Sequence, residues 1–152
     1  MNTNTLSQFR YRIFPTLFIV FLLSSCRVTF LPSYDAGIVQ QIETISIDID
    51  RLYLQMLEKD KAGERTYSEY VDGYINIEVE MNLLLTKNKA RPYNKDMVTN
   101  SQILLDQWIK WMDEHKQRND LSDLEIQYRR TYFNDMIFAI ISAEKFIPPA
   151  QN

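Results

Sequence analysis

Cysteine, histidine and glycine are scarce in this chain of 152 residues, which has one cysteine, one histidine and three glycines. A single cysteine excludes a disulfide within the chain, so the fold must be held together by packing. One histidine excludes the paired Glu-x-x-His motifs on which di-iron helical bundles depend. The chain also lacks a glycine-rich phosphate loop and a Gly-x-Ser-x-Gly nucleophile elbow, so the common signatures of catalysis are missing.

Positive charge is in short supply as well. The chain has 17 Lys and Arg against 20 Asp and Glu, a net charge of −3. If residues 1–25 are removed, two arginines go with them and the balance becomes 15 against 20, a net charge of −5. Because binding to nucleic acid requires a basic surface, we expect no nucleic-acid partner. The same balance argues against electrostatic attraction to anionic lipid, so we expect membrane attachment to come from the anchor.

The apolar run near the N-terminus is too short to cross a membrane. It extends from Ile13 to Leu23, follows Arg10 and Arg12, and is interrupted at Pro15. Eleven helical residues extend about 17 Å, whereas the hydrocarbon core of a bilayer is about 30 Å thick. A basic segment followed by a short apolar segment is typical of a signal peptide.

The run closes with Leu23-Ser24-Ser25-Cys26, an apolar residue and two small residues before the only cysteine. This segment resembles the lipobox of bacterial lipoproteins, and the resemblance covers only the first 26 residues. It implies that the Cys26 thiol receives a diacylglycerol group, that a peptidase cleaves before Cys26, and that the new amine is acylated. Several acyl chains anchor firmly, since each buried methylene contributes about 0.8 kcal/mol. The alternatives are an ordinary secretory signal with an incidental cysteine, or an uncleaved anchor.

The resemblance also bears on location. Arg27 follows Cys26 at the position where many lipoproteins retained in the inner membrane have aspartate, and the first acidic residue after it is Asp35. This favours attachment to the outer membrane, facing the periplasm. We therefore divide the chain into a signal peptide (1–25), a lipidated tether (26–36), a helical domain (37–147) and a tail (148–152).

Apolar residues beyond the tether recur at steps of three and four residues, which is the period of an α-helix. The first series is Ile38, Ile42, Ile45, Ile49, Leu52 and Met56. It predicts a helix over about 37–59, although Ile45, Ile47 and Ile49 also alternate as in a strand. Similar series predict helices over about 66–88, 94–117 and 122–146.

Two of these predicted helices begin with the pattern of a capping box, at Thr66–Glu69 and Ser122–Glu125. Gly73 lies inside the second helix, where it costs about 1 kcal/mol relative to alanine. Either a neighbouring helix approaches closely there, or the helix tolerates a weak point. Four helices of similar length with short loops predict an all-α fold, an antiparallel up-down-up-down four-helix bundle. The alternative is a pair of helical hairpins that dimerises; the sequence defines no oligomeric state.

His115 is the residue most suggestive of chemistry, because it lies on an apolar face close to Met112 and Asp113. A metal or haem ligand is one interpretation, but a capping or partly buried histidine near a helix end is simpler. Neighbouring carboxylates on one helix point in different directions and do not converge. We therefore predict no catalytic residue, no metal site, and no cofactor apart from the covalent lipid on Cys26.

Tyrosine and tryptophan side chains are the candidates for binding a partner. The tyrosine hydroxyl needs a hydrogen-bond partner when buried, and aromatic residues are favoured at protein interfaces. The alternative is that these residues form the edge of the core. The candidate interaction residues are Tyr67, Tyr70, Tyr74, Arg91, Trp108, Trp111, Tyr128 and Tyr132.

These observations predict a lipid-anchored cell-envelope protein that is not an enzyme. Its bundle would bind another envelope protein or support an assembly at the membrane. The second hypothesis is a bundle that binds a lipid, haem or another apolar molecule in a cavity near Trp108 and Tyr74. An enzyme that uses His115 is the third.

Overall fold

The computed structural model describes residues 32–59 and 63–147. Contacts within the chain divide it into two units, Met1–Phe30 and Leu31–Asn152, and all described residues belong to the second. The predicted signal peptide, Cys26 and the tail 148–152 lie outside the described residues. Within the described part of the chain, no helix is both long and apolar enough to cross a membrane.

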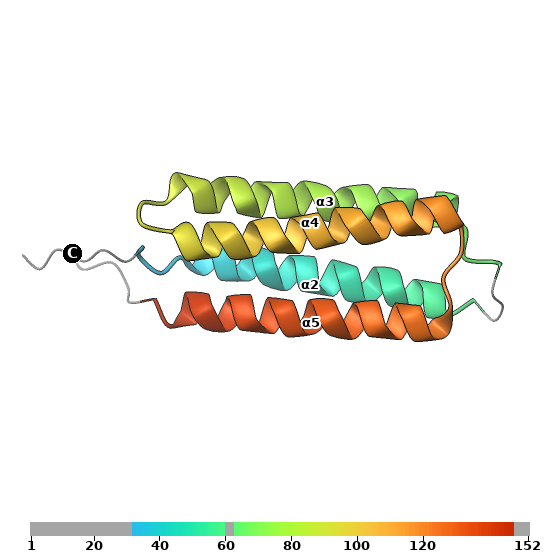
Figure 1. The fold of residues 1–152 in the computed structure, drawn as a ribbon. Helices are drawn as coiled ribbons and strands as arrows, with labels where there is room; N and C mark the ends of the chain where they lie inside the picture. The colour runs from blue at the N-terminus through green and yellow to red at the C-terminus, as the bar shows by residue number, and fades with distance from the viewer. Residues whose placement is uncertain (1–31, 60–62, 148–152) are drawn as a thin grey trace, which may run out of the picture. The chain divides into compact units, whose positions relative to one another are not determined.

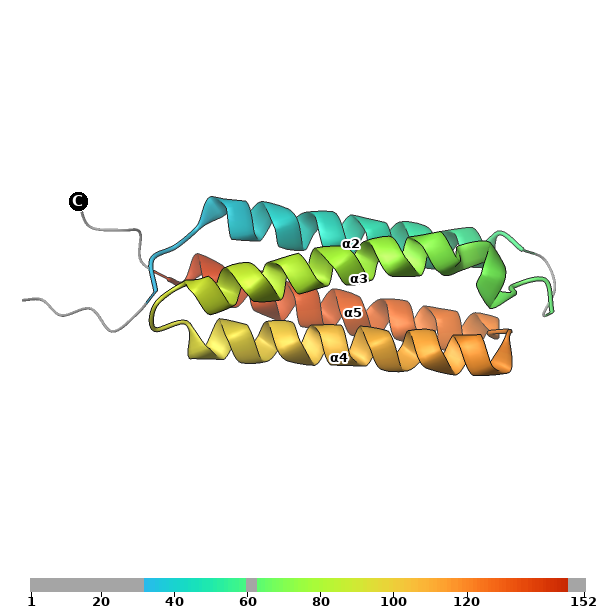
Figure 2. The same ribbon diagram turned by 90° about the horizontal axis from the view of Figure 1, so that it is seen from above.

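The described residues form four helices and no strand: α2 (Ala36–Leu57), α3 (Tyr67–Ala90), α4 (Lys95–Arg118) and α5 (Asp123–Lys145). The four lie side by side, each antiparallel to the next (Figures 1 and 2). α2 and α4 each pack against both α3 and α5, with no close backbone contact across the diagonals. The predicted four-helix bundle is confirmed, and every helix boundary falls within two residues of its predicted place.

The two ends of the bundle differ in which segments they hold. The entry end contains Pro32–Asp35, the α3–α4 connection and the end of α5 (Figure 1). The far end contains the α2–α3 and α4–α5 connections. The chain therefore enters the bundle at the end where α5 finishes.

The core follows the predicted helical period. In α2, Ile45 and Ile49 are fully buried, whereas Ile47 faces solvent. A strand would place all three side chains on one face, so their burial follows the helical period and not the alternation of a strand. Each of the other helices contributes large buried residues at the same spacing, including Tyr74, Met81, Leu84, Leu104, Trp108, Phe133 and Ile137.

Only one of the two predicted capping boxes forms. Ser122 accepts a hydrogen bond from the Glu125 amide, and the Glu125 carboxylate accepts one from the Ser122 amide. Thr66 is the N-cap of α3 but makes no such bond; its hydroxyl lies 3.2 Å from that of Ser68. The prediction at Thr66 was wrong because Glu69 instead faces Lys59 on the preceding segment, 3.5 Å away.

The glycine inside α3 marks a close approach of α2. A Cβ atom at Gly73 would lie 2.6 Å from Cδ1 of Leu52. This contact decides between the two explanations that the sequence left open, because the neighbouring helix occupies the space of a larger side chain.

Candidate interaction surface

Two of the predicted interaction residues, Tyr74 and Trp108, are fully buried where α3 meets α4. The Trp108 indole N–H donates a hydrogen bond to the Tyr74 carbonyl (3.1 Å), and the two ring centroids are 5.2 Å apart. The rings of Tyr53 and Phe133 pack against Trp108 at 6.3 and 5.4 Å. Tyr74 and Trp108 thus belong to the core and cannot touch a partner on the surface of the folded bundle.

His115 completes this buried cluster. Its Nε2 lies 2.7 Å from the Arg65 carbonyl oxygen and its Nδ1 lies 3.0 Å from the Tyr74 hydroxyl. A carbonyl can only accept, so Nε2–H is the donor and neutral Nδ1 accepts from the tyrosine. Burial lowers the pKa of His115 and raises that of Tyr74, which keeps both groups neutral. The Tyr74 hydroxyl thereby has the partner that a buried tyrosine needs.

Tyr67 and Tyr70 cover the cluster at the far end. Tyr67 is half-buried, stacks on Tyr74 with centroids 5.6 Å apart, and has the Lys116 ammonium 5.9 Å from its ring centre. Tyr70 is buried, with its ring 6.4 Å from that of His115. Neither ring is largely exposed, so both residues chiefly cover the far end of the core.

Arg91 is held inside the fold. Its guanidinium donates to both oxygens of the fully buried Glu144 carboxylate (2.7 and 3.0 Å) and to the Ser33 carbonyl (2.6 Å). Glu144 also accepts from the Asp35 amide at 3.1 Å. This bidentate pair joins the segment before α2 to the ends of α3 and α5, so Arg91 closes the entry end instead of offering an anchor to a partner.

Sequence reasoning missed Arg65, which closes the far end. This buried side chain donates to the carbonyls of Met56, Lys59 and Leu121 at 2.8 to 3.0 Å and pairs with Asp123 at 2.5 Å. Arg65 therefore satisfies loop carbonyls from both connections at that end. No local pattern marks it, because its partners lie up to 58 residues away in sequence.

The remaining three candidate residues meet at one place between α4 and α5, which we call the aromatic seam: Trp111, Tyr128 and Tyr132. The Trp111 ring lies 4.9 Å from Tyr132 and 5.9 Å from Tyr128, and the two tyrosine rings are 6.4 Å apart. Trp111 is buried, Tyr132 is half-buried and Tyr128 is 62% exposed. Solvent exposure therefore increases across the seam, from Trp111, which forms its buried floor, through Tyr132 to Tyr128 at its exposed rim.

Arg129 fixes the floor of the seam. Its guanidinium lies 5.2 Å from the Trp111 ring centre and donates to the Trp111 carbonyl (2.8 Å) and to Glu114 (2.9 Å). A buried guanidinium held by three contacts is rigid, and it stabilises the ring through a cation–π interaction. The floor of the seam is therefore held in one arrangement by contacts within the fold.

Bulky side chains account for the position of the seam. Among the four neighbouring helix pairs, the α4 and α5 backbones approach each other closely over the shortest stretch. Rings from both helices occupy the space between them, and the outermost rings emerge at the surface. Leu124 lies one turn before Tyr128 on α5 and is 77% exposed, which extends the apolar surface towards the far end.

No group of three or more His, Cys, Asp or Glu side chains among residues 32–59 and 63–147 is arranged to hold a metal ion. The chain matches no protein-family model, and no curated protein or solved structure shows significant similarity to it.

Proposed function

We propose that this chain is a lipid-anchored protein of the bacterial cell envelope, held by acyl groups on Cys26, and that its bundle docks a protein partner without catalysing a reaction. The proposal for the anchor rests on Leu23-Ser24-Ser25-Cys26 and the short apolar run before it. The outer membrane, on its periplasmic face, is the proposed location, because Arg27 replaces the aspartate that retains many lipoproteins in the inner membrane.

The aromatic seam is the proposed docking surface. The observation that carries this proposal is the exposure of Tyr128 and Leu124 on the outer side of α5, where a bundle helix ordinarily has polar residues. Tyrosine, tryptophan and arginine dominate the energetic centres of protein interfaces, and here all three types lie together on a rigid floor. An apolar side chain of a partner would cover the edge of Trp111 while the tyrosine hydroxyls bond at the rim.

A non-catalytic role agrees with how the polar core groups are used. His115 is engaged on both ring nitrogens, and Arg65 and Arg91 bond to loop carbonyls and carboxylates. The alternative, a bundle that binds an apolar molecule, would need a cavity beside Trp108 and Tyr74, where the rings of Tyr53, His115 and Phe133 pack against these two residues.

Site-specific photo-crosslinking in intact cells tests the docking surface. A photo-reactive amino acid at position 128 should give a discrete adduct with one envelope protein. The same group at Ile103 is the control, because Ile103 is 47% exposed on α4 and the residues three and four positions away on either side are polar. The adduct should disappear when Tyr132→Ala and Leu124→Ala are combined, and it should weaken with Cys26→Ala if anchoring brings the partners together. Equal adducts from positions 128 and 103, or an adduct insensitive to the alanine changes, would contradict the proposal.

A further inference from the structure

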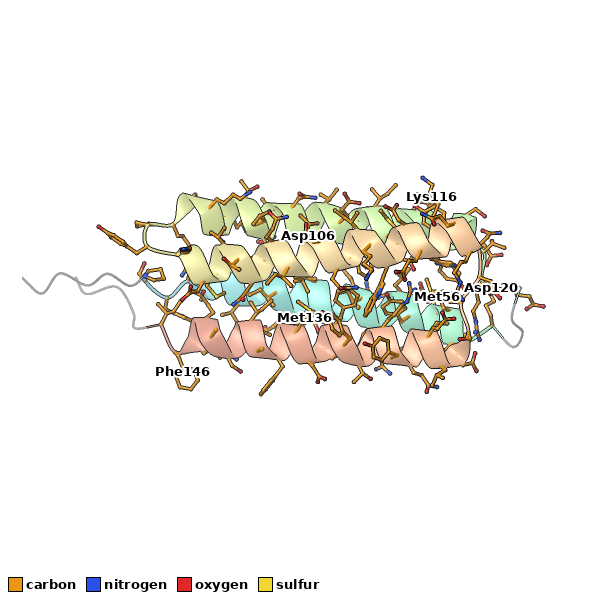
Figure 3. All side chains as sticks on the ribbon, viewed as in Figure 1. Met56, Asp106, Lys116, Asp120, Met136 and Phe146 are labelled. Carbon is orange, nitrogen blue, oxygen red and sulfur yellow. The ribbon has the colours of Figure 1, made fainter. Side chains whose placement is uncertain are left out.

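Two aromatic side chains project from the entry end of the bundle. Phe146, just beyond α5, is 88% exposed, and Tyr93, in the α3–α4 connection, is 64% exposed. Figure 3 shows Phe146 at this end with its ring pointing away from the helices, whereas Asp120 lies at the opposite end. Exposure of this extent leaves the Phe146 ring without a role in the core.

The two ends also differ in charge. Around the entry end, residues 32–37, 87–96 and 144–147 contain five Lys and Arg against three Asp and Glu. Around the far end, residues 58–59, 63–69 and 115–125 contain four Lys and Arg against six Asp and Glu. One of the three acids at the entry end, Glu144, is buried and paired. The entry end therefore has a net charge of +2 in a chain that is acidic overall.

Four lysines at the entry end are exposed; Lys87 donates to the Gln41 side chain (2.6 Å), and the other three are Lys89, Lys95 and Lys145. None of them forms an ion pair within the part of the chain that the structure describes. Beside them, Pro32, Tyr93, Met97 and Ile147 line a mainly apolar cleft of about 180 Å³. Aromatic rings together with lysines are the side chains that proteins place at the interface between a bilayer and water.

The proposed anchor is attached close to this end. Pro32 follows Cys26 by six residues, which extend about 20 Å at most. We propose that the entry end rests on the bilayer as a second membrane contact, with Phe146 and Tyr93 in the interfacial region and the three lysines on anionic headgroups. This inference rests on the proposed anchor for its geometry, but its chemistry can be tested without the anchor. It places the aromatic seam, whose α5 residues lie within three turns of the α5 start, on the half of the bundle away from the membrane.

Vesicle binding by the chain from Arg27 onward tests this contact. That chain keeps all four helices and their core, which lie within residues 32–147. We expect it to sediment with vesicles of phosphatidylglycerol and phosphatidylcholine, and far less with phosphatidylcholine alone. Each lysine near an anionic surface contributes about fivefold in partitioning, so Lys89→Gln with Lys95→Gln should weaken binding about 25-fold. Lys110→Gln with Lys116→Gln removes the same charge away from the entry end and should leave binding nearly unchanged.

The proposal would be overturned if the unsubstituted chain did not bind the vesicles. It would also be overturned if both pairs of lysine substitutions weakened binding equally, since overall charge would then account for the attraction.

A tryptophan probe gives an independent readout on the acylated protein in vesicles that contain brominated lipid. The fluorescence of a tryptophan introduced by Phe146→Trp should be quenched by the brominated lipid. The fluorescence of a tryptophan introduced by Leu124→Trp, at the far end, should not be quenched. Equal quenching at both positions would mean that the bundle lies flat and would also overturn the proposal. Failure of the anchor itself is detected separately, as a missing acyl mass on Cys26.

Discussion

The buried His115 predicts how the stability of the bundle depends on pH. Its neutral form donates to the Arg65 carbonyl and accepts from Tyr74, and burial lowers its pKa below the ordinary 6.5. The positive charges of Arg129 and Arg118 lower it further, while the Arg65 carbonyl and Asp120 act in the opposite direction. In the unfolded chain the same imidazole takes up a proton near pH 6.5.

Because the unfolded chain binds more protons than the folded one in this range, the free energy of unfolding must rise with pH. The stabilisation is fully present above pH 6.5 and is lost as pH falls towards the folded pKa. If His115 stays neutral in the folded state, the loss between pH 7.5 and pH 5 approaches about 2 kcal/mol, with a limiting slope of about 1.4 kcal/mol per pH unit. A folded pKa within this range makes the loss smaller.

Urea unfolding of the chain from Arg27 onward, followed by circular dichroism at several pH values, measures this effect. His115→Gln is the matched control, because a glutamine amide can donate to Arg65 and accept from Tyr74 but does not titrate. We expect the dependence between pH 7.5 and pH 5 to shrink strongly in that variant, even if its stability at pH 7.5 is lower. Identical pH dependence in the two chains would refute the assignment of a neutral, buried His115.

Three further predictions concern the ends of the helices. Arg91→Met leaves the buried Glu144 carboxylate unpaired and should lower the free energy of unfolding, measured in urea titrations, by about 3–5 kcal/mol. The control is Arg51→Met, at an exposed ion pair with Asp48, which should change it by less than about 1 kcal/mol. Ser122→Ala removes a formed cap and should cost about 1 kcal/mol, whereas Thr66→Ala, without a cap bond, should cost less in the same assay. The Arg118 guanidinium lowers the pKa of Glu125 to about 2. The stabilisation contributed by the Glu125 carboxylate is therefore present above pH 4.5 and lost as pH falls towards 2. In the Glu125→Gln variant, the free energy of unfolding should lack this part of the pH dependence.

The helical architecture could be predicted because it depends on a local, repeated pattern. The steps of three and four residues in α2 define a buried face, and Ile47 lies off that face and is exposed. Short connections then make neighbouring helices antiparallel. The difference between the two capping boxes was beyond sequence reasoning, because Glu69 faces Lys59 from another segment and this depends on the tertiary arrangement.

The candidate site was predicted only in part, for a similar reason. A tyrosine on an apolar face needs a partner for its hydroxyl, and the sequence does not show whether the fold supplies one. Tyr74 finds His115, 41 residues further along the chain, and both side chains are buried. Tyr70 is buried although its hydroxyl has no hydrogen-bond partner among the described residues, whereas Tyr128 remains at the surface. Helical spacing alone treats the three tyrosines alike.

Intact mass spectrometry of the protein extracted from the membrane fraction tests the central proposal, the lipid anchor, most directly. We predict a chain that begins at Cys26 and carries a diacylglycerol group and an additional acyl chain, and that stays a full-length, unacylated precursor in the Cys26→Ala variant. A chain cleaved at another position, or one that begins at Cys26 with an unmodified thiol, would contradict the proposed anchor.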